Sequence, residues 1–231
     1  MTSPEPELNV AWPKQVEPGA EVTQAIREAC TGNLGPARGL SAAVRFGLSV
    51  LLSGSVVVLL MVDRLGRMSS SAIVGTTLSA VGWGIVQAGV LFVGLARPPG
   101  HRGRRSARWA IALGVPILFI GYLRLIARHA TPPGAYFTNA GVHRTGLCGL
   151  HVLLLGALAT SAVFLVWRRT DPLSPGLSGA LTGLSGGLVG AVAMGFTCPC
   201  GQLWHLWLAH GLGVAVLTAA GWLAGRRWLT P

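Results

Sequence analysis

From Ser41 onward the chain alternates long apolar stretches with short polar links. Each stretch is close to the roughly 20 residues that an α-helix needs to cross the hydrocarbon core of a bilayer. A buried helix of a soluble protein would keep a polar stripe, and residues 48–62 and 152–166 show none. The pattern therefore predicts an all-α fold, a polytopic membrane bundle of six transmembrane helices. The predicted spans are 43–62, 72–96, 109–128, 147–167, 176–196 and 203–224.

Composition divides the chain into two parts, a tail over residues 1–40 and a six-helix membrane domain over 41–231. Repeated prolines up to Pro18 fix the backbone and remove hydrogen-bond donors, so the start of the tail is predicted to be extended or disordered. Apolar residues then recur at helical spacing and predict a short amphipathic helix near 20–31. That stripe consists of Val22, Ala25, Ile26, Ala29 and Cys30.

A helix this short is marginal alone and needs a surface to pack against. The surface could be the membrane interface, the bundle itself or another protein, and the tail could equally be an unstructured tether. If a protein partner binds, apolar tail residues such as Leu8 and Trp12 would join Val22 and Ile26 in the contact.

Charge is scarce and unevenly placed. Only 11% of the residues are charged, while 51% are hydrophobic. Five of the 7 acidic residues precede residue 29, and none falls inside a predicted span. Cation-coupled carriers usually retain a carboxylate at membrane depth, because such a group is costly and is kept for its chemistry. The sequence therefore argues against a cation-coupled carrier.

The 18 Lys and Arg residues follow the links and do not form one patch, so direct nucleic-acid binding is not expected despite the net charge of +11. Most of them lie before the first span, between the second and third, between the fourth and fifth, and after the sixth. By the positive-inside rule both termini are predicted to be cytoplasmic. No apolar signal-peptide core precedes Ser41, so the first span is expected to direct insertion.

The fifth span is unusually rich in glycine. Gly179, Gly183 and Gly187 are spaced by four residues and fall on one helical face. Small residues at this spacing let two membrane helices approach closely, so these glycines are predicted to be helix-packing positions.

Candidate chemistry gathers on the side of the membrane opposite the termini. Cys148 and His151 share one face at the start of the fourth span, Cys198 and Cys200 follow the fifth, and His205 opens the sixth. Three interpretations remain open: a disulfide from Cys148 to Cys198 or Cys200, a Cys/His site for zinc or another soft metal ion, and reduced, packed thiols. His210 lies about 140° around an α-helix from His205 and need not belong to this group.

The sequence contains none of the phosphate-binding, dinucleotide-binding, hydrolase or zinc-protease motifs that mark common enzymes. Nothing specifies an active site, and the protein is predicted not to be an enzyme.

In its layout the chain resembles the NrsF family, the negative regulators of sigma F, over about residues 30–231. The resemblance is carried by the segment Leu34-Gly-Pro-Ala-Arg38-Gly-Leu-Ser, Cys148, the glycine-rich fifth span, Cys198-Pro199, the group Trp204, His205, Trp207 and His210, and the closing segment Gly221–Trp228. Cys200 stands where the family more often has an acidic residue, and the tail before Leu34 is longer than expected.

The resemblance implies a six-span anti-sigma factor of the bacterial inner membrane. Its cytoplasmic tail, including Leu34 and Arg38, would hold an extracytoplasmic-function sigma factor and release it on a signal. The group Cys148, His151, Cys198, Cys200 and His205 would be the natural redox or metal sensor. The alternatives are an inner-membrane thiol oxidoreductase using Cys198 and Cys200, which would need a second cysteine pair, and a small-molecule carrier.

Overall fold

The computed structural model describes residues 19, 21, 23–24, 28, 40–65, 70–96, 105–127, 139–167, 174–198 and 200–229. The chain divides into two compact units, Met1–Gly39 and Leu40–Pro231. In the first unit the described residues Glu21, Thr23, Gln24 and Glu28 are helical. The tail residues predicted to contact a partner lie outside the described residues; they are Leu8, Trp12, Val22, Ile26, Leu34 and Arg38.

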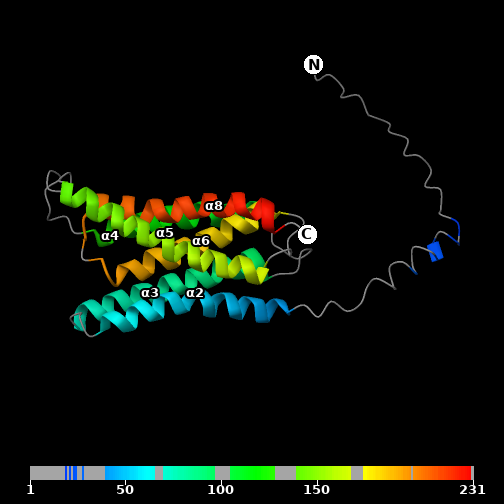
Figure 1. Cartoon of the computed structure of the whole chain (residues 1–231), viewed down its shortest axis with the longest axis horizontal. Helices are drawn as coiled ribbons and strands as arrows, with labels where there is room; N and C mark the ends of the chain where they lie inside the picture. The colour runs from blue at the N-terminus through cyan, green and yellow to red at the C-terminus, as the bar shows by residue number, and fades with distance from the viewer. Residues whose placement is uncertain are drawn as a thin grey trace, which may run out of the picture. The chain divides into compact units, whose positions relative to one another are not determined.

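The second unit is a bundle of long helices that lie side by side (Figure 1). All secondary structure in the described part of the chain is helical, and six helices are long and apolar enough to cross a membrane, which confirms the predicted fold class. In chain order the elements are α2 (Ala42–Leu65), α3 (Ser70–Leu91) with the π-helix η1 (Phe92–Ala96), α4 (Arg105–Ile126), α5 (Asn139–Trp167), α6 (Pro175–Gly195), and a last helix made of α7 (Leu203–His205), the π-helix η4 (Leu206–Gly211) and α8 (Leu212–Trp228).

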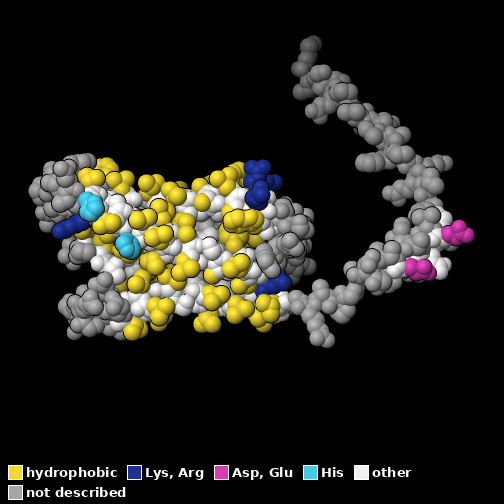
Figure 2. All heavy atoms as spheres, viewed as in Figure 1, with side chains coloured by type: hydrophobic (Ala, Val, Ile, Leu, Met, Phe, Trp, Pro, Cys, Tyr) yellow, Lys and Arg dark blue, Asp and Glu magenta, His cyan; other side chains and the backbone are white. Residues whose placement is uncertain are grey.

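The outer surface of the bundle is apolar. Large side chains such as Leu59, Leu125 and Leu165 are 71%, 84% and 69% exposed. Figure 2 shows hydrophobic side chains across the middle of the visible face, with Arg and His side chains near its two ends. Lipid is the solvent in which such a surface costs little free energy, because acyl chains are as apolar as leucine. The protein is a multi-pass membrane protein.

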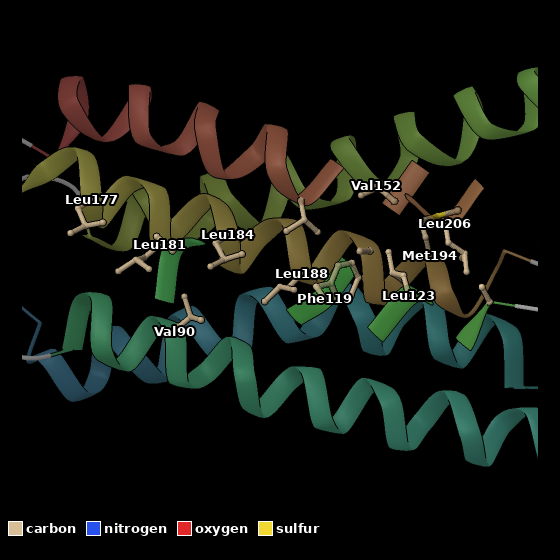
Figure 3. Packing of buried hydrophobic residues seen from close by; sticks show 14 residues of the cluster. Val90, Phe119, Leu123, Val152, Leu177, Leu181, Leu184, Leu188, Met194 and Leu206 are labelled. Carbon is tan, nitrogen blue, oxygen red and sulfur yellow. The ribbon is translucent and has the colours of Figure 1, made fainter. Parts of the chain in front are cut away.

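Helix α6 is the centre of the bundle. In its apolar stretch 94% of the residues are buried, compared with 11% in the corresponding stretch of α2. Figure 3 shows Leu181, Leu184 and Leu188 of α6 packed in one cluster with Val90 of α3 and Phe119 of α4. The glycine-rich sequence of α6 suits this position, since a helix surrounded by neighbours needs a narrow cross-section.

One face of α6 contacts α8 almost backbone to backbone. A Cβ atom added at Gly179 would lie 2.1 Å from the carbonyl oxygen of Gly221, and one added at Gly183 would lie 2.0 Å from that of Leu217. Gly187 is similarly placed against α8. Van der Waals contact at this distance is the main attraction between helices in lipid, so side chains here would separate them.

A second face of α6 contacts α5 in the same way. A Cβ atom at Gly186 would lie 2.5 Å from the carbonyl oxygen of Gly156, and one at Gly190 would lie 2.3 Å from that of Val152. Helices α5, α6 and α8 therefore form one tightly packed unit, on which α2, α3 and α4 rest.

Polar side chains join the remaining helices to this unit. In the buried interior, Gln87 of α3 donates hydrogen bonds to Ser53 of α2 (2.7 Å) and Ser185 of α6 (3.0 Å). Trp167 of α5 donates to Ser49 of α2 (2.8 Å). Each such bond between membrane helices contributes about 0.6 kcal/mol on average, so the network fixes which faces of α2 and α3 turn inward.

The bundle has two ends that differ in chemistry. Helices α2, α4 and α6 begin at what we call the Arg108 end. There the buried Arg108 of α4 donates to Ser174, which precedes α6, to Ser178 of α6 and to the Gly94 carbonyl of η1. Helices α3, α5 and α7 begin at the opposite end, which we call the Cys198 end.

We predict that Gly183→Ala destabilises the bundle by about 1–3 kcal/mol, because overpacking a close contact displaces a backbone. Gly195→Ala is the matched control in α6, since a Cβ there meets nothing within 4 Å. Thermal unfolding in detergent measures both variants. Equal stability of the two would show that the α6 and α8 backbones are not in contact.

Candidate functional site

Three of the sequence-predicted candidates meet at the Cys198 end. Cys148 lies in the first turns of α5, Cys198 follows α6, and His205 ends α7. The thiol sulfur of Cys198 lies 3.9 Å from that of Cys148 and 3.0 Å from Nε2 of His205. The ligand atoms of all three residues lie within 4.8 Å of one another. The close contact of α5 with α6 at Gly190 holds the first two elements together.

Helix α5 begins well before the apolar run at Leu147. Its first turns are polar and extend the helix beyond the hydrophobic stretch. That extension places Thr145 beside the site. The Thr145 hydroxyl donates to the Gly141 carbonyl (2.9 Å) and lies 3.1 Å from Nδ1 of His205. With the hydroxyl proton directed to the carbonyl, Nδ1 of His205 is the donor to Thr145. Nε2 of His205 then presents a lone pair to Cys198.

The electrostatics of the site favour a neutral thiol. The pKa of Cys198 is raised from 9.0 to about 12, and burial is the largest cause. The hydrogen bond with the Cys200 backbone lowers the pKa, and Cys148 raises it. Desolvation disfavours the thiolate, so at neutral pH the Cys198 sulfur keeps its proton and can donate it to Nε2 of His205. A thiol in this state becomes reactive when a base, a metal ion or an oxidant takes the proton.

His210 belongs to the neighbourhood of the site, contrary to the α-helical expectation. Its ring centroid lies 5.9 Å from that of His205. The cause is the π-helix η4, which begins directly after His205. In a π-helix the backbone hydrogen bonds join residues i and i+5, which widens each helical turn. Side chains five residues apart therefore lie on nearly the same side of the helix. No pattern in the sequence predicts this π-helix.

The two other candidates are placed differently. Cys200 lies next to the trio, with its backbone carbonyl 3.9 Å from the Cys198 sulfur, and its own sulfur is not among the three converging ligand atoms. His151 is exposed, and its Nδ1 lies 2.7 Å from the Leu147 carbonyl of its own helix. Thr145 is the residue that sequence reasoning missed, because a single hydroxyl three positions before a cysteine carries no distinctive pattern.

The trio can carry two kinds of chemistry. Two thiolates on one tetrahedral zinc ion lie about 3.8 Å apart, close to the 3.9 Å between the sulfurs of Cys148 and Cys198. His205 would supply a nitrogen as third ligand, so the donor set fits a soft or borderline metal ion. Alternatively the sulfurs can approach to form a disulfide, since Cys148, Cys198 and Cys200 are all free thiols.

The fold and the site together define a multi-pass membrane protein with a thiol and histidine group at one end. The family model described as "NrsF: Negative regulator of sigma F" matches residues 30–230. The chain therefore belongs to the NrsF family, which confirms the resemblance found in the sequence. The family name assigns its members to the negative regulation of a sigma factor. Comparison with curated proteins and with solved structures gives no match.

We predict that alkylation of Cys198 in the folded, reduced protein accelerates about tenfold per pH unit from pH 7 to pH 10, since only the thiolate reacts and the pKa is near 12. Mass spectrometry of iodoacetamide-treated samples gives the rate. In denaturant the same cysteine should level off near pH 8.5–9. A plateau at neutral pH in the folded protein would indicate a thiolate and imidazolium pair instead.

We also predict that diamide joins Cys148 to Cys198, because their sulfurs are already 3.9 Å apart. Non-reducing peptide mapping identifies the link. Cys200→Ser should retain it, whereas Cys148→Ser should remove it. A dominant link from Cys148 to Cys200 would mean that the loop after α6 is arranged differently in the membrane.

Proposed function

We propose that this protein is a non-enzymatic anti-sigma factor of the bacterial inner membrane, which holds an extracytoplasmic-function sigma factor through residues 1–40 and releases it when the Cys198 end receives a signal. The observation that carries the proposal is the family match over residues 30–230. The six apolar helices support the membrane location.

The basic residues support the orientation that we propose. Arg45, Arg105, Arg108, Arg226 and Arg227 all belong to helix ends at the Arg108 end. The positive-inside rule therefore assigns this end, and the tail that precedes α2, to the cytoplasm. The cysteine and histidine group then faces the periplasm, an oxidising compartment in which thiols can report redox state or metal supply.

The tail is the part that would bind the sigma factor. The described tail residues Glu21, Thr23, Gln24 and Glu28 are helical and exposed. The proposed contact residues Val22 and Ile26 are their neighbours in the sequence. A marginal helix gains stability by folding on a partner, so binding and folding would be coupled. Leu8, Trp12, Leu34 and Arg38 are the further contact residues that we propose.

Helix α6 offers a route between the two ends. It ends just before Cys198 and begins beside Arg108, to which Ser174 and Ser178 are hydrogen-bonded. Closing a disulfide would bring the sulfurs of Cys148 and Cys198 from 3.9 Å to about 2.05 Å apart, and would therefore change the fit of α5 on α6. Because packed helix interfaces have few alternative arrangements, such a change can shift the bundle between two packings.

We predict that the full-length protein in lipid nanodiscs retains an extracytoplasmic-function sigma factor of the same organism, and that Val22→Asp with Ile26→Asp weakens binding at least about tenfold by removing apolar anchors. Gln24→Asp is the control, since Gln24 is helical and exposed. Surface plasmon resonance measures the affinities.

In the same assay, diamide treatment should release the sigma factor from the unsubstituted protein and leave it bound to Cys148→Ser. Absence of any sigma-factor binding, or full binding by the doubly substituted tail, would contradict the proposed function.

A further inference from the structure

A cavity of about 690 Å³ lies at the Cys198 end between α3, α4, α6 and η4. Cys198, Cys200 and His210 belong to its lining, so the thiol of the candidate site is accessible from it. Its volume lies within the range of about 300–1,000 Å³ that is typical of small-molecule sites. Residues of the loop that follows α6 and of the first turns of α3 also line it.

One wall of the cavity is aromatic. Trp83 of α3 meets Phe119 and Tyr122 of α4 edge to face, with centroid distances of 4.8 and 5.4 Å. The Tyr122 hydroxyl is hydrogen-bonded to the hydroxyl of Ser79, and all four residues line the cavity. A ligand with a flat ring can stack on this wall and can reach two hydroxyl groups at one edge of it.

His210 adds a buried acceptor to the lining. Its Nδ1 lies 3.3 Å from the Ala191 carbonyl, which can only accept, so Nδ1 carries the ring proton and Nε2 carries a lone pair. The residue is 3% exposed, and Nε2 has no hydrogen-bond partner among the described residues. Buried polar atoms are rarely left unpaired, so this nitrogen calls for a donor from a ligand or a water molecule.

We infer that the cavity binds a membrane-soluble quinone, whose ring stacks on Trp83, Phe119 or Tyr122 and whose reduction oxidises Cys148 and Cys198 to a disulfide. Of the two hydroxyl protons of Tyr122 and Ser79, one makes their mutual hydrogen bond and the other is donated to a quinone oxygen. A hydroxyl of the reduced quinol donates to Nε2 of His210. The inference rests on the proposed function and names the oxidant to which the sensor responds.

The reaction balances with the groups present. Nε2 of His205 accepts the Cys198 proton, and the sulfur adds to a quinone ring carbon, forming an S–C bond as the ring takes the electron pair. Cys148 then attacks the Cys198 sulfur and its proton passes to the anionic quinone oxygen, so the S–S bond forms and the S–C bond breaks. The hydroquinone leaves with two electrons and with two protons, one of them returned by His205.

The test uses the reduced full-length protein in nanodiscs with ubiquinone-1, and follows quinol formation by absorbance and disulfide formation by mass spectrometry. We expect one quinol per Cys148–Cys198 disulfide, with a rate that saturates as the quinone concentration rises. Tyr122→Phe and His210→Asn should raise the half-saturating concentration about tenfold and leave the rate of oxidation by diamide unchanged. His143→Asn, an exposed histidine at the same end, is the matched control.

A rate that never saturates, or one that is the same in Tyr122→Phe, His210→Asn and the unsubstituted protein, would overturn the quinone site. So would a co-purified phospholipid that ubiquinone-1 does not displace. These outcomes can be told apart from failure of the proposed function. If only the quinone site is wrong, diamide would still release the sigma factor. If quinone formed the disulfide while the sigma factor stayed bound, the release step would fail and the quinone site would stand.

Discussion

The bundle depends on backbone-to-backbone packing of α6 against α5 and α8. In lipid there is no hydrophobic gain in joining two apolar helices, so contact distance decides whether they associate. Gly183 and Gly190 make that distance short, because even one carbon atom at either position would lie within 2.3 Å of a neighbouring carbonyl oxygen. The long apolar side chains of the other helices are thereby free to face lipid.

This packing also positions the chemistry. The contact at Gly190 holds α6 against Val152 and Gly156 in the middle of α5; Cys148 lies just before this part of α5, and Cys198 follows α6. At the other end of the same helix Arg108 is hydrogen-bonded to Ser178. The thiol group and the buried arginine are thus attached to one rigid element, which in our proposal connects a periplasmic stimulus to a cytoplasmic tail.

The sequence was sufficient for the fold class, because hydropathy over about 20 residues is a direct measure of what a bilayer accepts. It also included Cys148, Cys198 and His205 among five candidates, with His151 and Cys200, because the predicted topology placed all five on one side of the membrane. It could not show the π-helix that brings His210 near His205, or the polar extension of α5 that carries Thr145. Both depend on local hydrogen-bond geometry, which composition does not encode.

We propose that a change at the thiol site alters the packing of α6 along its whole length. Hydrogen exchange of the full-length protein, compared before and after oxidation of Cys148 and Cys198, tests this. We expect altered protection at the start of α6, around Ser178, as well as beside the cysteines. A change confined to the first turns of α5 and the segment 196–206 would contradict it.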